Sequence, residues 1–225
     1  MINRLHSWLH RPESGWDPVP GRHVLEYGAH QWSIGIDNRL LDELDERLGG
    51  FGGKQVLDLG GGPGQYAVAF AKRGAEVTWF DVSRRYRDFA EQKAREARVE
   101  MEFVLGYMDE SCRILQRQFD LVFNRICWYY CISDFSFAAV IYRLLKPGGW
   151  AFIDTNHSGV GWDSASLGLR ARIWMNDALG IKFGHPYPPR GRVEKLFRRF
   201  PLGRVAADYQ PRNDRILLQR KATST

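Results

Sequence analysis

The chain has 225 residues, of which 44% are hydrophobic and 26% are charged. These values are typical of a globular protein, and the length suits a single domain with a substantial core. No apolar run approaches the roughly 18 residues of a membrane-spanning helix, and the polar N-terminus lacks the apolar core of a signal peptide. The sequence therefore favours a cytoplasmic protein with no membrane partner.

The net charge of +6 is unevenly distributed along the chain. Residues 170–225 carry 13 Lys and Arg against 4 Asp and Glu, whereas residues 1–169 carry 19 against 22. This excess indicates either a solvated basic edge or a basic wall that attracts an anionic substrate. Because the basic residues are scattered and form no dense runs, the pattern disfavours nucleic acid as a partner.

The three cysteines are Cys112, Cys127 and Cys131. The last two are close enough in sequence to ligate a metal, but no histidine accompanies them, and three cysteines cannot all pair as disulfides. We expect reduced packing residues in a reducing compartment and no metal site.

The first 36 residues are rich in Trp, His, Pro and Gly. We expect residues 1–36 to be irregular and to form an N-terminal lid segment. From residue 37, leucines recur at helical spacing with charges between them, and Gly49 and Gly50 stop the run. This pattern predicts a helix over residues 37–48.

Strand and helix patterns alternate through the middle of the chain. Strands are predicted at 55–59, 76–80, 102–105, 119–123 and 150–154, with helices at 65–73, 84–98 and 135–145. Such alternation is typical of a parallel sheet with right-handed crossovers. Beyond it, residues 155–190 break the rhythm and are expected to form an inserted cap. A helix at 193–199 and a hairpin of strands 204–209 and 215–219 then close the chain.

These elements predict a single α/β domain over residues 1–225. Its sheet is expected to be Rossmann-like and doubly wound, with seven mostly parallel strands and an antiparallel C-terminal hairpin. The expected parts are the lid segment 1–36, a core 37–155, the cap 155–190, and the closing helix and hairpin 191–225.

A glycine-dense turn follows the first predicted strand. Residues 56–64 contain Asp58 near the end of that strand and then Gly60, Gly61, Gly62 and Gly64. Glycines let a ligand approach the backbone closely, and the next helix presents free N–H groups. The second strand ends at Asp81, where a carboxylate can accept both hydroxyls of a ribose. The combination predicts a site for a cofactor that contains a nucleoside.

Two cofactor classes compete for this turn. Residues 62–67 fit the loose dinucleotide pattern GxGxxA, which is a weak signal by itself. In a dinucleotide fold, however, the first glycine follows the strand directly, and Pro63 removes an N–H from the turn. The alternative pattern DxGxGxG, which begins at Asp58, has every position filled.

Four motifs then occur in order within residues 37–155. They are the DxGxGxG turn from Asp58, Asp81 at the end of the second strand, the FDLV strand from Phe119 and the LLKPGG turn from Leu144. Together they resemble the class I S-adenosylmethionine-dependent methyltransferases. The resemblance implies that residues 37–155 bind S-adenosylmethionine, that S-adenosylhomocysteine is a product, and that the protein is an enzyme that transfers a methyl group.

The resemblance also implies which residues hold the cofactor. Asp58 and the turn with Gly60, Gly61, Gly62 and Gly64 are expected beside the methionine moiety. Asp81 is expected to accept the ribose hydroxyls, and Val82 to pack on the adenine. Many relatives have Gly-Asp where this chain has Gly106-Tyr107, which leaves Met108 and Asp109 as the expected adenine contacts. Asn124 is expected near the reactive sulfonium.

Methyl transfer from a sulfonium needs a nucleophile held in line with the sulfur. A base helps only where the acceptor must lose a proton. Since ligands of open α/β sheets lie at the carboxyl ends of the strands, His157 after the fifth strand is the first candidate base. His30 in the lid segment is the second and His185 in the cap the third. For each, the alternative is a structural histidine.

The loop after the fourth strand is the expected acceptor side. Trp128 and Tyr129 are interpreted either as core packing or as a stacking wall for a ring. Arg125 is expected to hold a carboxylate or phosphate of the acceptor, with Arg170, Arg172 and Arg190 as helpers. The strand lacks the Asn/Asp-Pro-Pro-Tyr/Phe signature of base amino methylation, which disfavours DNA.

The favoured function is therefore O-methylation of a hydroxyl or carboxylate on a small anionic or ring-containing acceptor, a metabolite or glycan. Two alternatives stay open: an RNA or protein methyltransferase that uses the basic C-terminal third, and a non-catalytic member of the fold that only binds the cofactor. A nicotinamide enzyme is a more distant alternative. The chain is expected to be a monomer or a homodimer.

Overall fold

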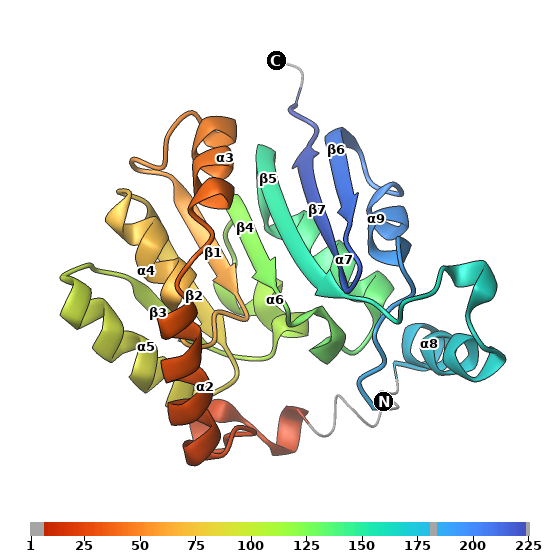
Figure 1. The fold of residues 1–225 in the computed structure, drawn as a ribbon, viewed down its shortest axis with the longest axis horizontal. Helices are drawn as coiled ribbons and strands as arrows, with labels where there is room; N and C mark the ends of the chain where they lie inside the picture. The colour runs from red at the N-terminus through yellow and green to blue at the C-terminus, as the bar shows by residue number, and fades with distance from the viewer. Residues whose placement is uncertain (1–6, 181–183, 224–225) are drawn as a thin grey trace.

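The structure, a computed structural model, describes residues 7–180 and 184–223. A sheet of seven strands in the order β3-β2-β1-β4-β5-β7-β6 runs through the middle of the molecule (Figure 1). Strands β1 to β5 pair in parallel, and β7 pairs antiparallel with both β5 and β6. The predicted fold class is confirmed. The strands are β1 (Gln55–Leu59), β2 (Glu76–Asp81), β3 (Glu102–Leu105), β4 (Phe119–Arg125), β5 (Leu145–Asn156), β6 (Leu202–Tyr209) and β7 (Asn213–Arg220).

Helices cover both faces of this sheet (Figure 1). One apolar cluster packs residues of α2 to α5 against one face, and a second packs residues of α6, α7 and α9 against the other. Since both faces are covered, the central strands are apolar along almost their whole length. The helices are α2 (Gly21–Ile34), α3 (Asn38–Leu48), α4 (Gln65–Lys72), α5 (Arg84–Ala97), α6 (Ser111–Leu115), α7 (Asp134–Leu144), α8 (Leu167–Leu179) and α9 (Arg192–Phe197).

Helix α3 shows how local sequence sets an element. Asp37 is its N-cap and accepts a hydrogen bond from the Leu40 N–H at 3.2 Å. Gly49 ends the helix in the left-handed conformation, with φ of 69°. Both signals are readable from the sequence, and the predicted helix 37–48 matches α3 closely.

The expectation of an irregular N-terminal segment is wrong for α2. Two of its apolar side chains, Leu25 and Ile34, are 65% exposed, so the segment lacks a clean amphipathic pattern. It is held instead by close packing on α5, where a Cβ on Gly28 would lie 2.9 Å from the Phe89 ring. Tertiary contact thus stabilises a helix that periodicity does not reveal.

Two further differences concern element boundaries. Strand β5 begins at Leu145 and includes the Lys-Pro-Gly-Gly turn, because the β4–β5 register shifts between Phe119 and Leu121. The short helix α6 was not predicted, since five residues are too few to show a helical period. Within the described residues, no helix combines the length and apolar character needed to cross a membrane.

Short 3-10 turns occur in the loops that end the strands and in the N-terminal segment. They carry no apolar periodicity, but two of them lie beside the site described below. They are η1 (Pro12–Ser14), η2 (Met108–Glu110), η3 (Trp128–Tyr130) and η4 (Trp162–Ser164).

Candidate functional site: a crevice at the carboxyl ends of the strands

The glycine turn after β1 is anchored to β2 by its backbone. The N–H groups of Gly60 and Gly61 both donate to the Phe80 carbonyl, at 2.7 and 3.2 Å. Gly60 has φ of +82°, and a Cβ there would lie 2.5 Å from the Cys127 Sγ. At Gly62, with φ of +47°, a Cβ would meet no described atom within 4 Å. The turn is therefore tightly packed at its start and open at its middle.

Asp81 connects the end of β2 to this turn. Its Oδ2 accepts a hydrogen bond from the Gly62 N–H at 3.0 Å, and its Oδ1 accepts one from the Ser83 N–H at 2.9 Å. Burial raises the pKa of Asp81, while these N–H groups act in the opposite direction. The carboxylate is half-buried, and each oxygen keeps lone pairs for a ligand.

Asp58 lies deeper, on β1 below the turn, and is 4% exposed. Burial, and then the nearby charge of Asp81, raise its pKa to about 7. The Ala67 N–H and the Arg125 charge act in the opposite direction. A buried carboxylate of this kind is stabilised in its ionised form by a cationic ligand.

Trp79 on β2 supports the turn and was missed by the sequence reasoning. Its indole Nε1 donates to the Gly62 carbonyl at 3.1 Å. Its ring lies so close to Gly61 that any Cβ there would clash. The available signal was an aromatic residue two positions before Asp81, on the same face of the same strand.

The end of β4 supplies a polar side chain to the same crevice. Asn124 is fully buried, and its Nδ2 donates to the Leu59 carbonyl at 2.8 Å and lies 3.0 Å from the Cys127 Sγ. Its Oδ1 is buried with no hydrogen-bond partner among the described residues. The Met108 Sδ lies 3.8 Å from Asn124 Nδ2. Burial strongly raises the pKa of Cys127, so this thiol stays protonated.

The backbone turns sharply just after Asn124. Ile126 has φ of +56°, a left-handed conformation that is unfavourable for a β-branched residue, and its N–H donates to the Asp154 carbonyl at 2.6 Å. Strain of this kind tends to cluster at functional sites. Here it directs Cys127 back toward Gly60.

The three residues expected to contact the adenine, Val82, Met108 and Asp109, lie in different surroundings. Val82 is half-buried directly after Asp81. Met108 lies beside Asn124, and its Sδ would be 3.2 Å from a Cβ on Gly60, so it contacts the glycine turn. Both carboxylate oxygens of Asp109 accept from the Ile132 N–H at 3.1 Å, so Asp109 ties η2 to the loop after β4. Asp109 thus has a structural contact, and its expected contact with the adenine stays a prediction.

Arg125 lies at the carboxyl end of β4, on the face covered by α4. Its guanidinium stacks over the Tyr66 ring at 5.2 Å, and its Nε lies 3.4 Å from the buried carboxylate of Asp154. Arg215 on β7 approaches the same carboxylate at 3.8 Å. Arg125 is thus held in place by a ring and an anion, and it stays one-quarter exposed.

Trp128 is not a stacking wall, because its side chain is completely buried. Its Nε1 donates to Asp134 Oδ1 at 2.8 Å, and its ring packs on Phe137 and Phe197. The packing interpretation is therefore the correct one. Tyr129 is half-buried and packs edge-on against Tyr187 of the cap, with ring centroids 4.9 Å apart.

His157 is buried, and both of its ring nitrogens are engaged. Nδ1 accepts from the Gly159 N–H at 2.9 Å, so Nε2 carries the proton and donates to the Gln210 carbonyl at 3.0 Å. No lone pair is left to take a proton from an acceptor. The geometry is that of a structural histidine and contradicts the expected role as base. His30 is exposed on α2.

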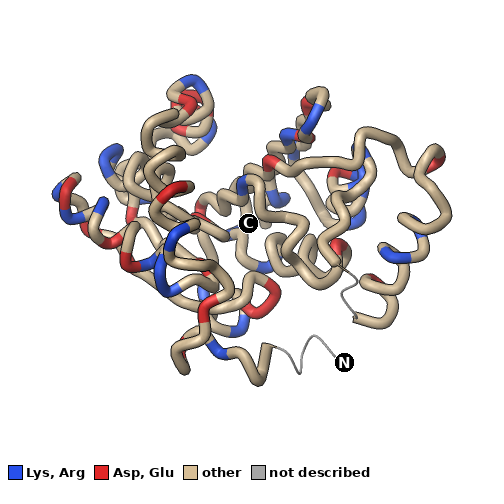
Figure 2. Tube along the Cα trace, turned by 60° about the horizontal axis from the view of Figure 1, so that its bottom comes forward, with Lys and Arg blue, Asp and Glu red and all other residues tan. Residues whose placement is uncertain are grey.

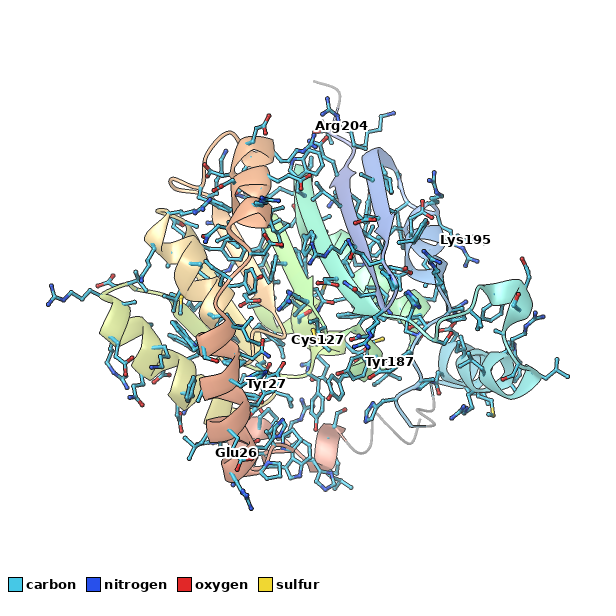
Figure 3. All side chains as sticks on the ribbon, in the orientation of Figure 1. Glu26, Tyr27, Cys127, Tyr187, Lys195 and Arg204 are labelled. Carbon is cyan, nitrogen blue, oxygen red and sulfur yellow. The ribbon has the colours of Figure 1, made fainter. Side chains whose placement is uncertain are left out.

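The lid helix α2 brings a tyrosine to the crevice that sequence reasoning did not select. Tyr27 is half-buried and packs edge-on against Tyr86, with ring centroids 6.4 Å apart. Burial raises its pKa, and the nearby positive charge of Arg125 acts in the opposite direction. Figure 3 shows Tyr27, Cys127 and Tyr187 around the carboxyl ends of the strands, whereas Arg204 lies at the opposite end of the molecule and Lys195 on α9 at its side.

The remaining basic candidates do not gather at the crevice. Arg170 donates to the Asp163 carbonyl, Arg190 donates to the Tyr209 carbonyl, and Arg172 is exposed on α8. Figure 2 shows the Lys and Arg residues of the C-terminal third interspersed with acidic ones. His185 packs edge-on against the exposed Tyr130, at 5.1 Å between ring centroids. These three arginines therefore contact, or are exposed on, the cap and the C-terminal hairpin.

A cavity of about 390 Å³ opens elsewhere, at the amino ends of β2 and β3. Glu102 pairs there with Arg117, and Thr78 donates to the same carboxylate. Because ligands of open α/β sheets bind at the carboxyl ends of the strands, we assign this cavity no part in the site. Among the described residues, no group of His, Cys, Asp and Glu is arranged to hold a metal ion.

Comparison with known proteins agrees with this geometry. Residues 56–149 match the family model of a methyltransferase domain. The ubiquinone biosynthesis O-methyltransferase of Salmonella newport is 33% identical over 136 residues, which are 60% of this chain and 56% of that protein. The chain thus matches little more than half the length of this curated relative.

Solved structures share the fold. An O-methyltransferase family protein from Burkholderia thailandensis superimposes with a TM-score of 0.60 at 20% identity, covering 76% of this chain and 52% of that one. A phosphoethanolamine N-methyltransferase of Haemonchus contortus, solved with S-adenosylhomocysteine, gives 0.59 at 16% identity, covering 83% and 53%. With its strand order and glycine turn, the chain has the fold of the class I S-adenosylmethionine-dependent methyltransferases, and residues 56–149 match their domain.

Proposed function

We propose that this chain transfers a methyl group from S-adenosylmethionine to an oxygen of a small-molecule acceptor. The observation that carries the proposal is the meeting of three features at one sheet edge. These are the open glycine turn at Gly62, the Asp81 carboxylate beside it, and the unpartnered Oδ1 of Asn124. The choice of oxygen is supported by the curated relative, which is named an O-methyltransferase.

The residues present fit this cofactor. A ribose offers two hydroxyl donors, and Asp81 has acceptor capacity left at the mouth of the crevice. The methionine end carries an ammonium group, which suits the buried Asp58 carboxylate and the Asn124 Oδ1. The space above Gly62 lets a ligand approach the backbone. Gly60, Gly61, Gly64, Val82 and Met108 complete the proposed cofactor set.

The chain's contribution to the reaction is positioning. When bound, the cofactor supplies an electrophilic methyl group on a positively charged sulfur, whose bond to that methyl breaks as the acceptor oxygen forms its own. The chain must hold the acceptor oxygen about 3 Å from the methyl carbon and in line with sulfur. An acceptor hydroxyl must also lose its proton, to water or to a base in solution, in the same step or just before it, and both ring nitrogens of His157 are already engaged. An acceptor carboxylate has no proton to lose.

Arg125 and Tyr27 are the proposed acceptor contacts. Arg125 is fixed by Tyr66 and Asp154, so it can orient a carboxylate or a ring-bound oxygen with little loss of side-chain freedom. The raised pKa of Tyr27 keeps its hydroxyl protonated at neutral pH, which makes it a hydrogen-bond donor. Tyr129 and Tyr187 are proposed to form the aromatic side that faces a ring. In this arrangement the lid segment 1–36 and the cap 155–190 enclose the acceptor above the core 37–155.

Calorimetry with S-adenosylhomocysteine and then a methyl-transfer screen test the proposal. The wild-type protein is expected to bind S-adenosylhomocysteine and to show no heat with NAD. Tritiated methyl groups from S-adenosylmethionine are expected to appear on phenolic or carboxylate acceptors, with an Asp81→Asn variant as the blank. A protein that binds NAD and ignores S-adenosylhomocysteine would overturn the proposal, and methylation of RNA or protein alone would overturn its acceptor class.

A further inference from the structure

A strap formed by residues 10–19 crosses the outside of the crevice before α2 begins. It lies below the carboxyl ends of the strands in Figure 1, far in sequence from the residues it touches. The strap lies outside the matched methyltransferase domain, residues 56–149. Two separate anchors hold it, one at the start of α5 and the other at the end of β3.

The first anchor is the carboxylate of Asp17, whose side chain is only 5% exposed. It accepts hydrogen bonds from the Ser83 hydroxyl at 3.0 Å, the Arg85 N–H at 2.8 Å and the Val19 N–H at 2.9 Å. An anion at a helix N-terminus is further stabilised by the helix dipole. The Arg84 guanidinium adds a hydrogen bond to the Pro12 carbonyl at 2.9 Å.

The second anchor is Tyr107, which stands where many members of the family have an acidic residue. Its hydroxyl donates to the His10 carbonyl at 2.9 Å. Its ring stacks with Trp16, with centroids 6.1 Å apart and planes inclined by 26°. Arg11 pairs with Glu110 at 2.8 Å on the same side. Tyr107, which departs from the family pattern, is therefore in contact with strap residues that lie outside the matched domain.

The two anchors lie on either side of the place where a nucleoside would sit. Ser83 follows Asp81 by two residues, and Tyr107 follows Leu105 by two, and Asp81 and Leu105 are register partners on β2 and β3. The Gly106 N–H also donates to the Asp81 carbonyl at 3.0 Å. A strap fixed at both positions lies close to the Asp81 carboxylate, on which the charge of Asp17 acts.

We propose that the strap is the outer wall of the adenosine subsite, with Trp16 and Tyr107 facing the purine ring and Asp17 as the latch that retains the cofactor. The inference rests on the proposed function, because it assigns a wall to the same cofactor crevice. An aromatic pair suits a purine, which has a face for stacking. Exchange of the cofactor then requires the hydrogen bonds of Asp17 to break, so the latch sets the rate of release.

The principal test is an Asp17→Asn variant of the full-length protein. The new amide places a donor against the Ser83 hydroxyl and the Arg85 N–H, while the side-chain volume is unchanged. We expect S-adenosylhomocysteine to dissociate at least tenfold faster, measured by surface plasmon resonance. The matched control is Asp42→Asn. Asp42 lies on α3, its carboxylate is 70% exposed and pairs with Arg73, and this variant should release the ligand at the wild-type rate.

A Tyr107→Phe variant provides a second test in case the Asp17→Asn variant does not fold. It keeps the ring and removes only the hydroxyl that binds the His10 carbonyl, and we expect faster release of several-fold. The second probe is methylthioadenosine, which has the adenosine end without the amino-acid tail and should be affected in the same proportion.

The outcomes separate the two proposals. Wild-type binding of S-adenosylhomocysteine with unchanged release from folded Asp17→Asn and Tyr107→Phe variants overturns the strap and leaves the cofactor site intact. If these variants lose affinity for S-adenosylhomocysteine but not for methylthioadenosine, the strap proposal is also overturned. The strap would then contact the amino-acid end of the cofactor and not its adenosine end. A wild-type protein that binds neither ligand overturns the cofactor proposal and the strap together.

Discussion

The crevice has two proposed halves, one for the cofactor and one for the acceptor, and they are built in different ways. In the cofactor half, Asp58, the glycine turn and Asp81 come from two adjacent parallel strands and the loop between them. In the acceptor half, Arg125, Tyr27 and Tyr187 come from β4, the lid helix and the cap, which meet only through tertiary packing. The cofactor half is therefore built from residues that are close in sequence. The acceptor half depends on how segments that are far apart in sequence pack against each other.

This contrast predicts where small changes have the largest effect. Gly60→Ala puts a Cβ 2.5 Å from the Cys127 Sγ in a left-handed conformation, so the turn must move. We expect S-adenosylhomocysteine to bind at least 100-fold more weakly, which is about 2.8 kcal/mol, as measured by calorimetry. Gly53→Ala is the matched control, since Gly53 has φ of +67° but no described atom within 4 Å of a Cβ.

The control should lower stability by about 1 kcal/mol and leave ligand affinity unchanged. If both alanine variants bind the ligand equally well, close packing at Gly60 is not what shapes the cofactor half.

Two of the three histidines considered as bases give the next largest effect. His157→Ala removes a buried ring with hydrogen bonds to Gln210 and Gly159, and we expect it to lower the free energy of unfolding by about 2–3 kcal/mol. His30→Ala, at an exposed position, should change it by less than about 0.5 kcal/mol. Thermal denaturation measures both.

Methyl transfer distinguishes a structural histidine from a base. Measured well below the melting temperature, turnover per folded His157→Ala molecule should match that of the wild type. A tenfold loss of turnover with no loss of stability would restore His157 as a base and contradict the hydrogen bonds seen at its ring.

A third prediction concerns the acceptor half. Arg125→Gln keeps a polar side chain but removes the charge that we propose faces the acceptor, and we expect the KM for an anionic acceptor to rise about tenfold. The Kd for S-adenosylhomocysteine should stay within about twofold of the wild type. Arg204→Gln, at the far edge of the molecule in Figure 3, is the control for loss of one positive charge. Equal effects of the two variants would point to net charge and away from a contact.

The sequence predicted the strands and the helix of the proposed cofactor half well because their signals are local. The strand-turn-helix from Gln55 to Lys72 and the strand that ends at Asp81 appear in the structure at almost the expected residues. Steric demands on a glycine and the alternation of buried positions are properties of neighbouring residues, so a single chain displays them.

The acceptor half was predicted less well because burial there depends on docking. Trp128 and Tyr129 are adjacent and aromatic, yet the first is completely buried and the second half-buried. His157 follows a strand end, as a catalytic residue often does, but the hairpin loop at Gln210 folds over it. Tyr27 had no periodic signal, because α2 exposes two of its own apolar side chains. These outcomes depend on contacts between residues far apart in sequence.

The smallest predicted effect separates the two halves by their response to pH. The pKa of Asp58 is raised to about 7, so the empty protein binds a proton there that the unfolded chain has lost. The contribution of this group to stability is therefore greatest below the unfolded pKa of about 3.9 and is lost as the pH rises through 7. A ligand with an ammonium group favours the carboxylate and lowers that pKa, so binding should release a proton near pH 7.

We accordingly expect the affinity for S-adenosylhomocysteine to increase severalfold between pH 6 and pH 8. Calorimetry in buffers of different ionisation enthalpy measures the released proton directly. Asp58→Asn should abolish both the proton release and the pH dependence, whereas Arg125→Gln, in the acceptor half, should retain the proton release. Proton release that persists in Asp58→Asn would place the titrating group elsewhere, and the buried carboxylate would then be a support for the turn with no direct part in holding the ammonium.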